Sequence, residues 1–207
     1  MEGKRRAAVF LDRDGTINEE VGYLDRPERL RLIPGAAEAI RLINASGMKA
    51  VVVTNQSGVA RGIFDETVVG MVHARLRELL LAEGGVLDGI YFCPHHPTEG
   101  RGRYLLSCDC RKPAPGLLLR AAAELNLDPT RSYMVGDTLK DIEAGTRVGA
   151  RGVLVRTGYG ADSAAALESS EEPAPKNPGG KTHIVEPAHI AGDILAAVRW
   201  LLKDREK

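Results

Sequence analysis

Short, uninterrupted apolar runs alternate along this chain with longer stretches of helical periodicity. The clearest runs are Ala7 to Leu11 and Ala50 to Val53, and each has the length of a strand. A strand that is apolar at every position is buried on both faces, as in parallel sheets that helices cover on both sides. The alternation therefore predicts an α/β fold with a doubly wound, Rossmann-like parallel sheet.

The same alternation continues to the end of the chain. Further strands are expected at 90–92, 132–135, 152–155 and 182–185. Helices are expected at 36–46, at about 65–83, from 115 to 125, from 138 to about 148 and at 190–202. The stretch 161–181, rich in Ala, Ser, Glu, Pro and Gly, is expected to be a flexible loop. The length predicts a single domain, 1–207, without room for a separate cap domain.

The charge balance narrows the classes of partner. Lys plus Arg equals Asp plus Glu at 28 each, which gives no reason to expect a nucleic acid or a membrane surface as partner. The apolar run that ends before Asp12 is too short for a signal peptide and lacks a cleavage pattern. We therefore expect a cytoplasmic protein, and nothing in the sequence demands more than a monomer.

Two carboxylates, Asp12 and Asp14, follow the first predicted strand directly and precede Gly15. Ligands of open parallel sheets bind beyond the carboxyl ends of the strands, where this pair should lie. A carboxylate can attack phosphorus when a cation offsets the repulsion, and a neighbouring carboxyl can protonate the departing oxygen. The pattern Asp-x-Asp-Gly also occurs in plain turns, so its meaning depends on what lies elsewhere in the site.

Three further polar groups occur where the same sheet edge would place them. They are Thr54 after the second strand, Lys112 in Arg111-Lys112-Pro113, and Asp137 with Asp141 in Gly136-Asp137-Thr138-Leu139-Lys140-Asp141. In this order the four motifs resemble those of the haloacid-dehalogenase-like phosphatase superfamily. The resemblance implies that Asp12 is the nucleophile, that Asp14 is the acid and then the base, and that Thr54 and Lys112 hold phosphate oxygens. It also implies a catalytic Mg²⁺ bound by Asp12, the main-chain carbonyl of Asp14 and Asp137, with Asp141 behind these ligands.

All three cysteines of the chain lie between positions 93 and 110. The segments Cys93-Pro94-His95-His96 and Cys108-Asp109-Cys110 offer three thiolates and an imidazole, which suit tetrahedral zinc. Cytosolic thiols stay reduced, which favours metal ligands over disulfides. The pattern lacks the common two-residue spacer, however, so ordinary reduced cysteines with a surface histidine stay open on this evidence alone.

The residues around these cysteines form a more specific pattern than the cysteine spacing alone. Together with Leu11 to Asn18, Val53 to Gly62 and Met134 to Asp137, it resembles the D-glycero-D-manno-heptose 1,7-bisphosphate 7-phosphatases and their histidinol-phosphate phosphatase relatives, over residues 7 to about 158. The resemblance implies a structural zinc on Cys93, His95, Cys108 and Cys110, with His96 outside the ligand set. The insertion 93–112 would then be a zinc-binding loop that fixes Arg111 and Lys112.

The same resemblance suggests a substrate, a small phosphorylated sugar. It places Arg13, Glu20, Gly22, Tyr23, Asn55, Gln56, Ser57 and Arg111 around that substrate. Arg61 and Arg103 are further candidates for a second phosphate, although solvated arginines are the preferred interpretation for both.

The predicted reaction is removal of the 7-phosphate of heptose 1,7-bisphosphate, in the synthesis of heptose-nucleotide precursors for lipopolysaccharide or other surface glycans. The alternative is histidinol phosphate or another small phosphomonoester. A more remote alternative is a non-catalytic, zinc-stabilised binding protein. Such a protein would be expected to lack Asp12, Asp14, Lys112 or Asp137, and all four are present.

Overall fold

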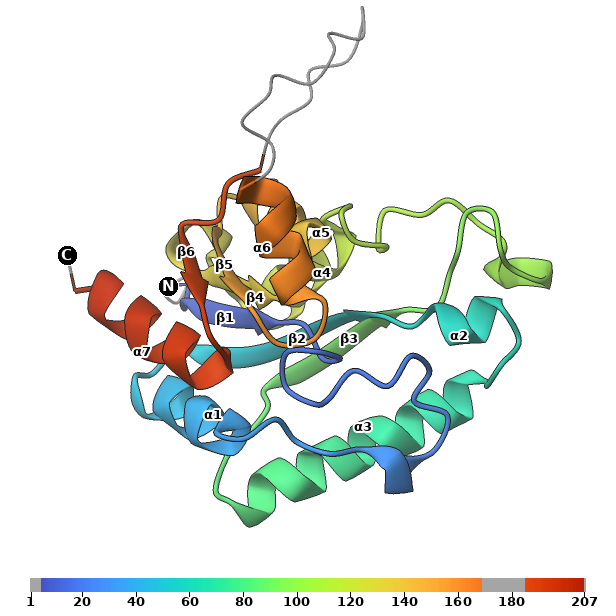
Figure 1. Cartoon of the computed structure of the whole chain (residues 1–207), viewed down its shortest axis with the longest axis horizontal. Coiled ribbons are helices and arrows are strands. Elements are labelled where there is room, and N and C mark those ends of the chain that lie inside the picture. Colours follow the sequence, from blue (N-terminus) through green and yellow to red (C-terminus); the bar gives the residue numbers. More distant parts are fainter. Residues whose placement is uncertain (1–4, 169–184, 207) are drawn as a thin grey trace, which may run out of the picture.

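The structure is a computed structural model that describes residues 5–168 and 185–206. Its centre is a parallel sheet of six strands in the order β3-β2-β1-β4-β5-β6 (Figure 1). The strands are β1 (Ala8–Leu11), β2 (Lys49–Asn55), β3 (Gly89–Cys93), β4 (Tyr133–Gly136), β5 (Arg151–Val155) and β6 (His189–Ala191). The prediction of a doubly wound parallel sheet is confirmed.

Helices cover both faces of this sheet. In the part of the chain that the structure describes, the helices are α1 (Ala36–Ala45), α2 (Ser57–Ala60), α3 (Glu66–Ala82), α4 (Gly116–Glu124), α5 (Leu139–Thr146), α6 (Gly160–Glu168) and α7 (Ile194–Asp204). Short 3-10 turns lie at Pro27–Arg29, Gly102–Tyr104 and Pro129–Arg131. Across the described residues, no helix combines the length and apolar character needed to cross a lipid bilayer.

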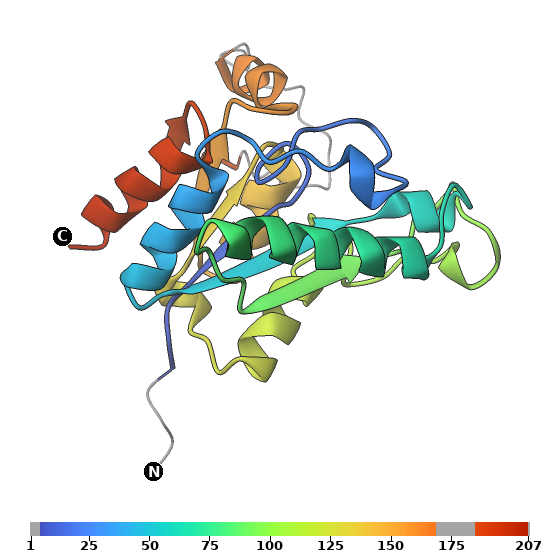
Figure 2. The ribbon, with the colours of Figure 1, turned by 90° about the horizontal axis from the view of Figure 1, so that it is seen from below.

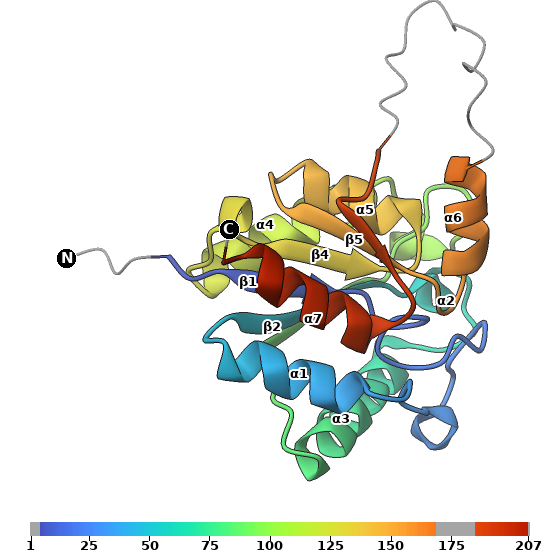
Figure 3. The same cartoon turned by 60° about the vertical axis from the view of Figure 1, so that its left-hand side comes forward.

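Alternate residues of β1 supply two separate cores. Val9 and Leu11 pack with α1, α3 and α7 on one face, whereas Ala8 and Phe10 pack with α4 and α5 on the other. Figure 2 shows α4 across the sheet from α1 and α7, and Figure 3 shows α1 and α7 side by side. Because both faces are buried, β1 and the centre of β2 carry only apolar residues, as the continuous apolar runs indicate.

The end of the chain differs from the prediction. Helix α6 occupies 160–168, where a loop was expected, because alanine favours helix even without an apolar stripe. The rest of the predicted loop lies outside the described residues. A strand was also predicted at 182–185. Val185 is not in a strand, and positions 182–184 lie outside the described residues. The sixth strand of the sheet is β6, at His189–Ala191. The last helix begins at Ile194, because the Asp193 carboxylate accepts a hydrogen bond from the Ala196 N–H at 2.8 Å.

Candidate active site

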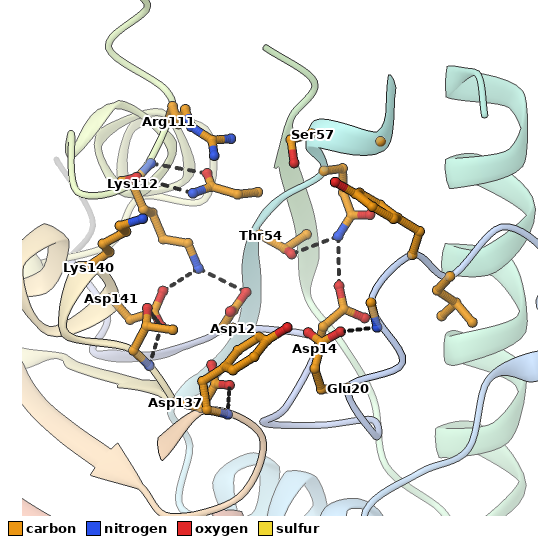
Figure 4. A pocket seen from close by; sticks show the side chains of 18 of the residues that line it. Asp12, Asp14, Glu20, Thr54, Ser57, Arg111, Lys112, Asp137, Lys140 and Asp141 are labelled. Atoms are coloured by element: carbon orange, nitrogen blue, oxygen red, sulfur yellow. Dashed lines mark hydrogen bonds and ion pairs between the residues drawn. The ribbon is translucent and has the colours of Figure 1, made fainter. Parts of the chain in front are cut away.

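A cavity of about 340 Å³ lies beyond the carboxyl ends of β1, β2 and β4 (Figure 4). Most of the residues predicted to act in catalysis, metal binding or substrate binding line it: Asp12, Asp14, Glu20, Gly22, Tyr23, Thr54, Asn55, Gln56, Ser57, Arg111, Lys112, Asp137 and Asp141. Of those sets, only Arg13 and the four predicted zinc ligands lie elsewhere. The fold therefore brings residues from four separate segments, 12–23, 54–57, 111–112 and 137–141, into one space.

Lys112 is a buried cation at the centre of the site. Its ammonium lies 2.8 Å from Asp12 Oδ1 and 2.6 Å from Asp141 Oδ1 (Figure 4). It also donates a hydrogen bond to the Val53 carbonyl at 2.7 Å. Burial alone would lower the pKa of Lys112, but the two carboxylates outweigh it and raise the pKa above its ordinary value. Lys112 therefore stays charged beside the predicted nucleophile.

Strand β2 fixes the main chain that carries this lysine. The Asn55 amide donates to the Lys112 carbonyl and accepts from the Lys112 N–H, both at 3.1 Å. An amide side chain that makes both bonds to one residue mimics a strand partner. Asn55 was predicted to contact substrate; in the structure it lines the cavity while its amide holds Lys112.

Three carboxylates, from Asp12, Asp137 and Asp141, come within 4.8 Å of one another through single oxygen atoms. Burial, and then the Asp12 charge, raises the pKa of Asp137 to about 8. Burial also raises the pKa of Asp12 to about 6, although the Lys112 charge opposes the shift. Three crowded carboxylates against one ammonium leave an excess of negative charge, so the cluster fits a hard cation such as Mg²⁺.

Asp141 differs from the other two because both of its oxygens already have partners. One pairs with Lys112, and the other accepts hydrogen bonds from the N–H and the hydroxyl of Thr138 at 3.0 and 2.7 Å. This capping box begins α5 at Leu139. This arrangement agrees with the expectation that Asp141 lies behind the metal ligands and does not bind the ion itself.

Asp137 is held between two stretches of glycine backbone. A Cβ atom at Gly15 or Gly158 would lie 2.2 Å from Asp137 Oδ2, and φ is +75° and +56° at these glycines. The same oxygen accepts a hydrogen bond from the Tyr159 N–H at 2.8 Å. Only glycine fits both positions, so Gly15, in the loop that follows β1, also makes room for the aspartate that follows β4.

Asp14 is held by donors on both of its carboxylate oxygens. Arg13 Nη2 donates to Oδ2 at 2.7 Å and Gln56 Nε2 to the same oxygen at 2.9 Å, while Asn18 Nδ2 donates to Oδ1 at 2.9 Å. Burial would raise the pKa of Asp14, but the Arg13 charge and these hydrogen bonds outweigh it, so the pKa lies below its ordinary value. Asn18 has no predicted role from the sequence, because an asparagine in a loop carries no signal of its own.

Arg13 lies beneath the cavity and does not line it. Its side chain is 1% exposed and is directed at Asp14. Arg13 was predicted to bind substrate, but in the structure its guanidinium is buried and pairs with Asp14. Burying a guanidinium demands such a partner.

The rest of the cavity lining comes from the segments that follow β1, β2, β4 and β5. The Glu20 carboxylate accepts from the Gly22 N–H, and the Tyr23 ring meets Phe64 edge to face at 6.5 Å between centroids. Ser57 begins the single turn α2. Phe64, Lys140 and Tyr159 also line the cavity and were not predicted, although Lys140 lies within the Gly136 to Asp141 motif.

The four predicted zinc ligands also meet. Cys93 Sγ lies 3.5 Å from Cys108 Sγ and 3.2 Å from Cys110 Sγ, and His95 Nδ1 lies 3.4 Å from Cys110 Sγ. Disulfide bonds measure about 2.05 Å. Four bonds of about 2.3 Å to one zinc ion would separate the sulfurs by roughly 3.8 Å, so the cluster fits a tetrahedral metal. The His96 ring accepts the Glu99 N–H at 2.9 Å and is not part of the cluster.

Arg111 follows the last cysteine of this cluster and is held by it. Its Nη1 donates to the His95 carbonyl at 3.1 Å, while the side chain lines the cavity. Arg61 pairs with Glu99 instead, and Arg103 pairs with Glu66. Neither of these last two arginines lines the cavity.

Comparison with known proteins agrees with this geometry. Residues 109–178 match the family model described as "HAD-hyrolase-like". The D-glycero-beta-D-manno-heptose-1,7-bisphosphate 7-phosphatase of Pasteurella multocida is 48% identical over 154 residues, which is 74% of this chain and 83% of the relative. The D-glycero-D-manno-heptose-1,7-bisphosphate 7-phosphatase of Thermosynechococcus vestitus is 43% identical over 200 residues, 95% of each chain.

Among solved structures, the D,D-heptose 1.7-bisphosphate phosphatase from B. bronchiseptica, complexed with magnesium and phosphate, has a TM-score of 0.78 and 31% sequence identity. The match covers 96% of this chain and 99% of that one. With the motifs, the parallel sheet and these relatives in agreement, the chain belongs to the heptose 1,7-bisphosphate 7-phosphatase family of the haloacid-dehalogenase-like hydrolases.

Proposed function

We propose that this protein is a Mg²⁺-dependent phosphatase that converts D-glycero-D-manno-heptose 1,7-bisphosphate to heptose 1-phosphate through a phosphoaspartate on Asp12. The observation that carries the proposal is the single cavity where Asp12, Asp14 and Lys112 meet. The names of the relatives support the substrate. The reaction would serve the synthesis of heptose-nucleotide precursors for surface glycans, as a monomer in the cytoplasm.

In the first half-reaction an Asp12 oxygen attacks the phosphorus of the 7-phosphate. The bond between phosphorus and the sugar oxygen breaks, and that oxygen takes a proton from Asp14. Arg13 holds Asp14 ionised before substrate binds, but a phosphate dianion beside it opposes that charge and favours the protonated form. The Lys112 ammonium and the Thr54 hydroxyl would hold the phosphate oxygens as charge builds up on them.

In the second half-reaction Asp14, now a carboxylate, takes a proton from water. The water oxygen attacks the phosphorus, the bond to Asp12 breaks, and inorganic phosphate forms. The donors that hold Asp14 as a carboxylate, Arg13, Asn18 and Gln56, suit this base role. Asp12 then regains its place beside Lys112.

Two metals belong to the proposal. Asp12, Asp137 and the main-chain carbonyl of Asp14 would bind Mg²⁺, with Asp141 behind them, and the ion would supply positive charge against the repulsion between Asp12 and the phosphate. Cys93, His95, Cys108 and Cys110 would bind a structural zinc ion. A site with four protein ligands leaves no open position for catalysis, so the zinc would act by fixing Arg111 and Lys112.

A second phosphate on the sugar needs a second cationic contact. Arg111 lines the same cavity as Asp12 and is tied to the zinc loop through the His95 carbonyl. An arginine can bind a phosphate through two parallel hydrogen bonds. We assign it the 1-phosphate, and we place Glu20, Gly22, Tyr23, Gln56 and Ser57 around the sugar.

The direct test is phosphate release from both anomers of heptose 1,7-bisphosphate and from histidinol phosphate, with and without Mg²⁺. We expect Mg²⁺-dependent release, fastest with a heptose bisphosphate, and heptose 1-phosphate as the product by ³¹P NMR. Faster turnover of histidinol phosphate would overturn the substrate assignment. If the folded, metal-loaded protein hydrolyses no phosphomonoester, it is not a phosphatase.

A further inference from the structure

A histidine outside the cavity touches the buried arginine that holds Asp14. His73 lies on α3, and its Nε2 is 3.2 Å from Arg13 Nη1. A guanidinium only donates hydrogen bonds, so the His73 nitrogen must accept, which requires a neutral ring with its proton on Nδ1. Burial, and then the Arg13 charge, lowers the pKa of His73 to about 3, which agrees with a neutral ring.

The guanidinium of Arg13 is occupied on both sides. Its Nε and Nη2 donate to Asp14 Oδ1 at 3.1 and 2.9 Å, and Nη2 also reaches Gln56 Oε1 at 3.1 Å. The remaining nitrogen, Nη1, is the one that meets His73. Because the guanidinium is planar and rigid, fixing Nη1 also fixes the edge that faces Asp14.

The His73 ring is itself fixed. It meets the Phe92 ring of β3 edge to face, with 5.7 Å between centroids. A helix and a strand therefore define where the imidazole lies, and a chain of contacts runs from Phe92 through His73 and Arg13 to Asp14. Asp14 has 21% of its side chain exposed, toward the cavity.

We propose that His73 is a positioning residue of this active site: its ring holds the Arg13 guanidinium, and through it keeps the Asp14 carboxyl aimed at the leaving oxygen. The inference rests on the proposed function, in which Asp14 protonates that oxygen. Without the acceptor on His73, a buried Nη1–H has no partner, and the guanidinium turns to find one. Asp14 then turns with it, while Asp12 and Lys112 keep their places.

Comparing two leaving groups distinguishes a positioning role of His73 from a purely structural one. A sugar alkoxide needs a proton to depart, whereas p-nitrophenolate leaves without one. The ratio kcat/KM covers only the steps up to departure of the leaving group, so hydrolysis of the phosphoaspartate does not obscure the comparison. His73→Phe keeps an aromatic ring beside Phe92 and removes the acceptor.

We expect His73→Phe to lower kcat/KM for the sugar bisphosphate roughly tenfold and for p-nitrophenyl phosphate by less than about twofold. His73→Gln, whose amide oxygen can reach the position of Nε2, should recover most of the loss. His189→Phe is the matched control, because His189 is a half-buried ring stacked on Trp200 away from the site, and it should change neither value. An equal loss on both substrates, or no loss on the sugar ester, overturns the proposal.

The test stays separate from the substrate assignment. If wild-type enzyme prefers another alkyl phosphate, the assigned function fails, and the same comparison is made on that ester. Independently of turnover, ¹⁵N NMR of the holoenzyme should show the His73 ring neutral, with its proton on Nδ1. A proton on Nε2 would exclude the contact with Arg13 on which the inference depends.

Discussion

Replacing Lys112 with methionine should destabilise the folded protein strongly when Mg²⁺ is absent. The Lys112 side chain is 2% exposed, and its ammonium pairs with Asp12 at 2.8 Å and Asp141 at 2.6 Å. Methionine fills similar space but leaves the buried carboxylates without their cation. Removing one partner of a buried ion pair costs about 3–5 kcal/mol. For a chain of this length that corresponds to a fall in Tm of roughly 6–20 °C.

The loss should depend on pH, with a sign that follows from the carboxylates. Asp12 and Asp137 have pKa values raised to about 6 and about 8 in the folded protein, mainly by burial. A carboxyl with a raised pKa binds its proton more tightly when folded, so its cost to stability grows as pH rises through that pKa. Without Lys112 these pKa values rise further. The variant should therefore be least stable, relative to wild type, at about pH 8 and recover toward pH 5.

Urea unfolding followed by circular dichroism would measure the difference, in Mg²⁺-free buffer that leaves zinc bound. Lys49→Met is the matched control, because Lys49 pairs with Asp88 at 2.6 Å but is 30% exposed. Partly exposed pairs contribute about 1 kcal/mol or less. If both variants lose the same free energy of unfolding at pH 8, the buried charge of Lys112 stabilises the fold no more than a partly exposed one does.

Three more predictions concern the proposed chemistry. Asp12→Asn should abolish turnover and leave the circular dichroism spectrum unchanged; near-normal rates would exclude a covalent step on Asp12. Cys108→Ala should lower the zinc content measured by atomic absorption, and lower activity as Arg111 and Lys112 lose support; unchanged zinc would remove Cys108 from the ligand set. Mg²⁺ should raise Tm more at pH 8 than at pH 6, because protons compete for Asp12 and Asp137 at the lower pH; equal shifts would contradict that competition.

The central part of the fold could be predicted because burial on both faces leaves a plain mark in the sequence. Runs such as Ala50 to Val53 are apolar at every position, and the structure buries all four residues in β2. The residues that end these strands then meet by topology alone, since all the strands point the same way. That is why Asp12, Thr54 and Asp137 could be placed together without any coordinates.

Other features left weaker marks. Strand β6 has only three residues, too few for a pattern, and α6 buries only Gly160 and Ala164. His73 is a single histidine in a helix, and its contact with Arg13 spans 60 positions in the chain. Arg13 itself lies between two aspartates that line the cavity, and sequence order does not state which way its long side chain turns. These contacts depend on packing, which no local pattern encodes.

Cys93 and Asn55 hold the two ends of the zinc-loop insertion, residues 93–112. The insertion is anchored twice, once where Cys93 ends β3 and again where the Asn55 amide grips Lys112. Residues 97–106 lie between these two anchors and do not line the cavity. Substitutions in that stretch should therefore leave Lys112 in register with the nucleophile, because both ends of the insertion are held independently of it.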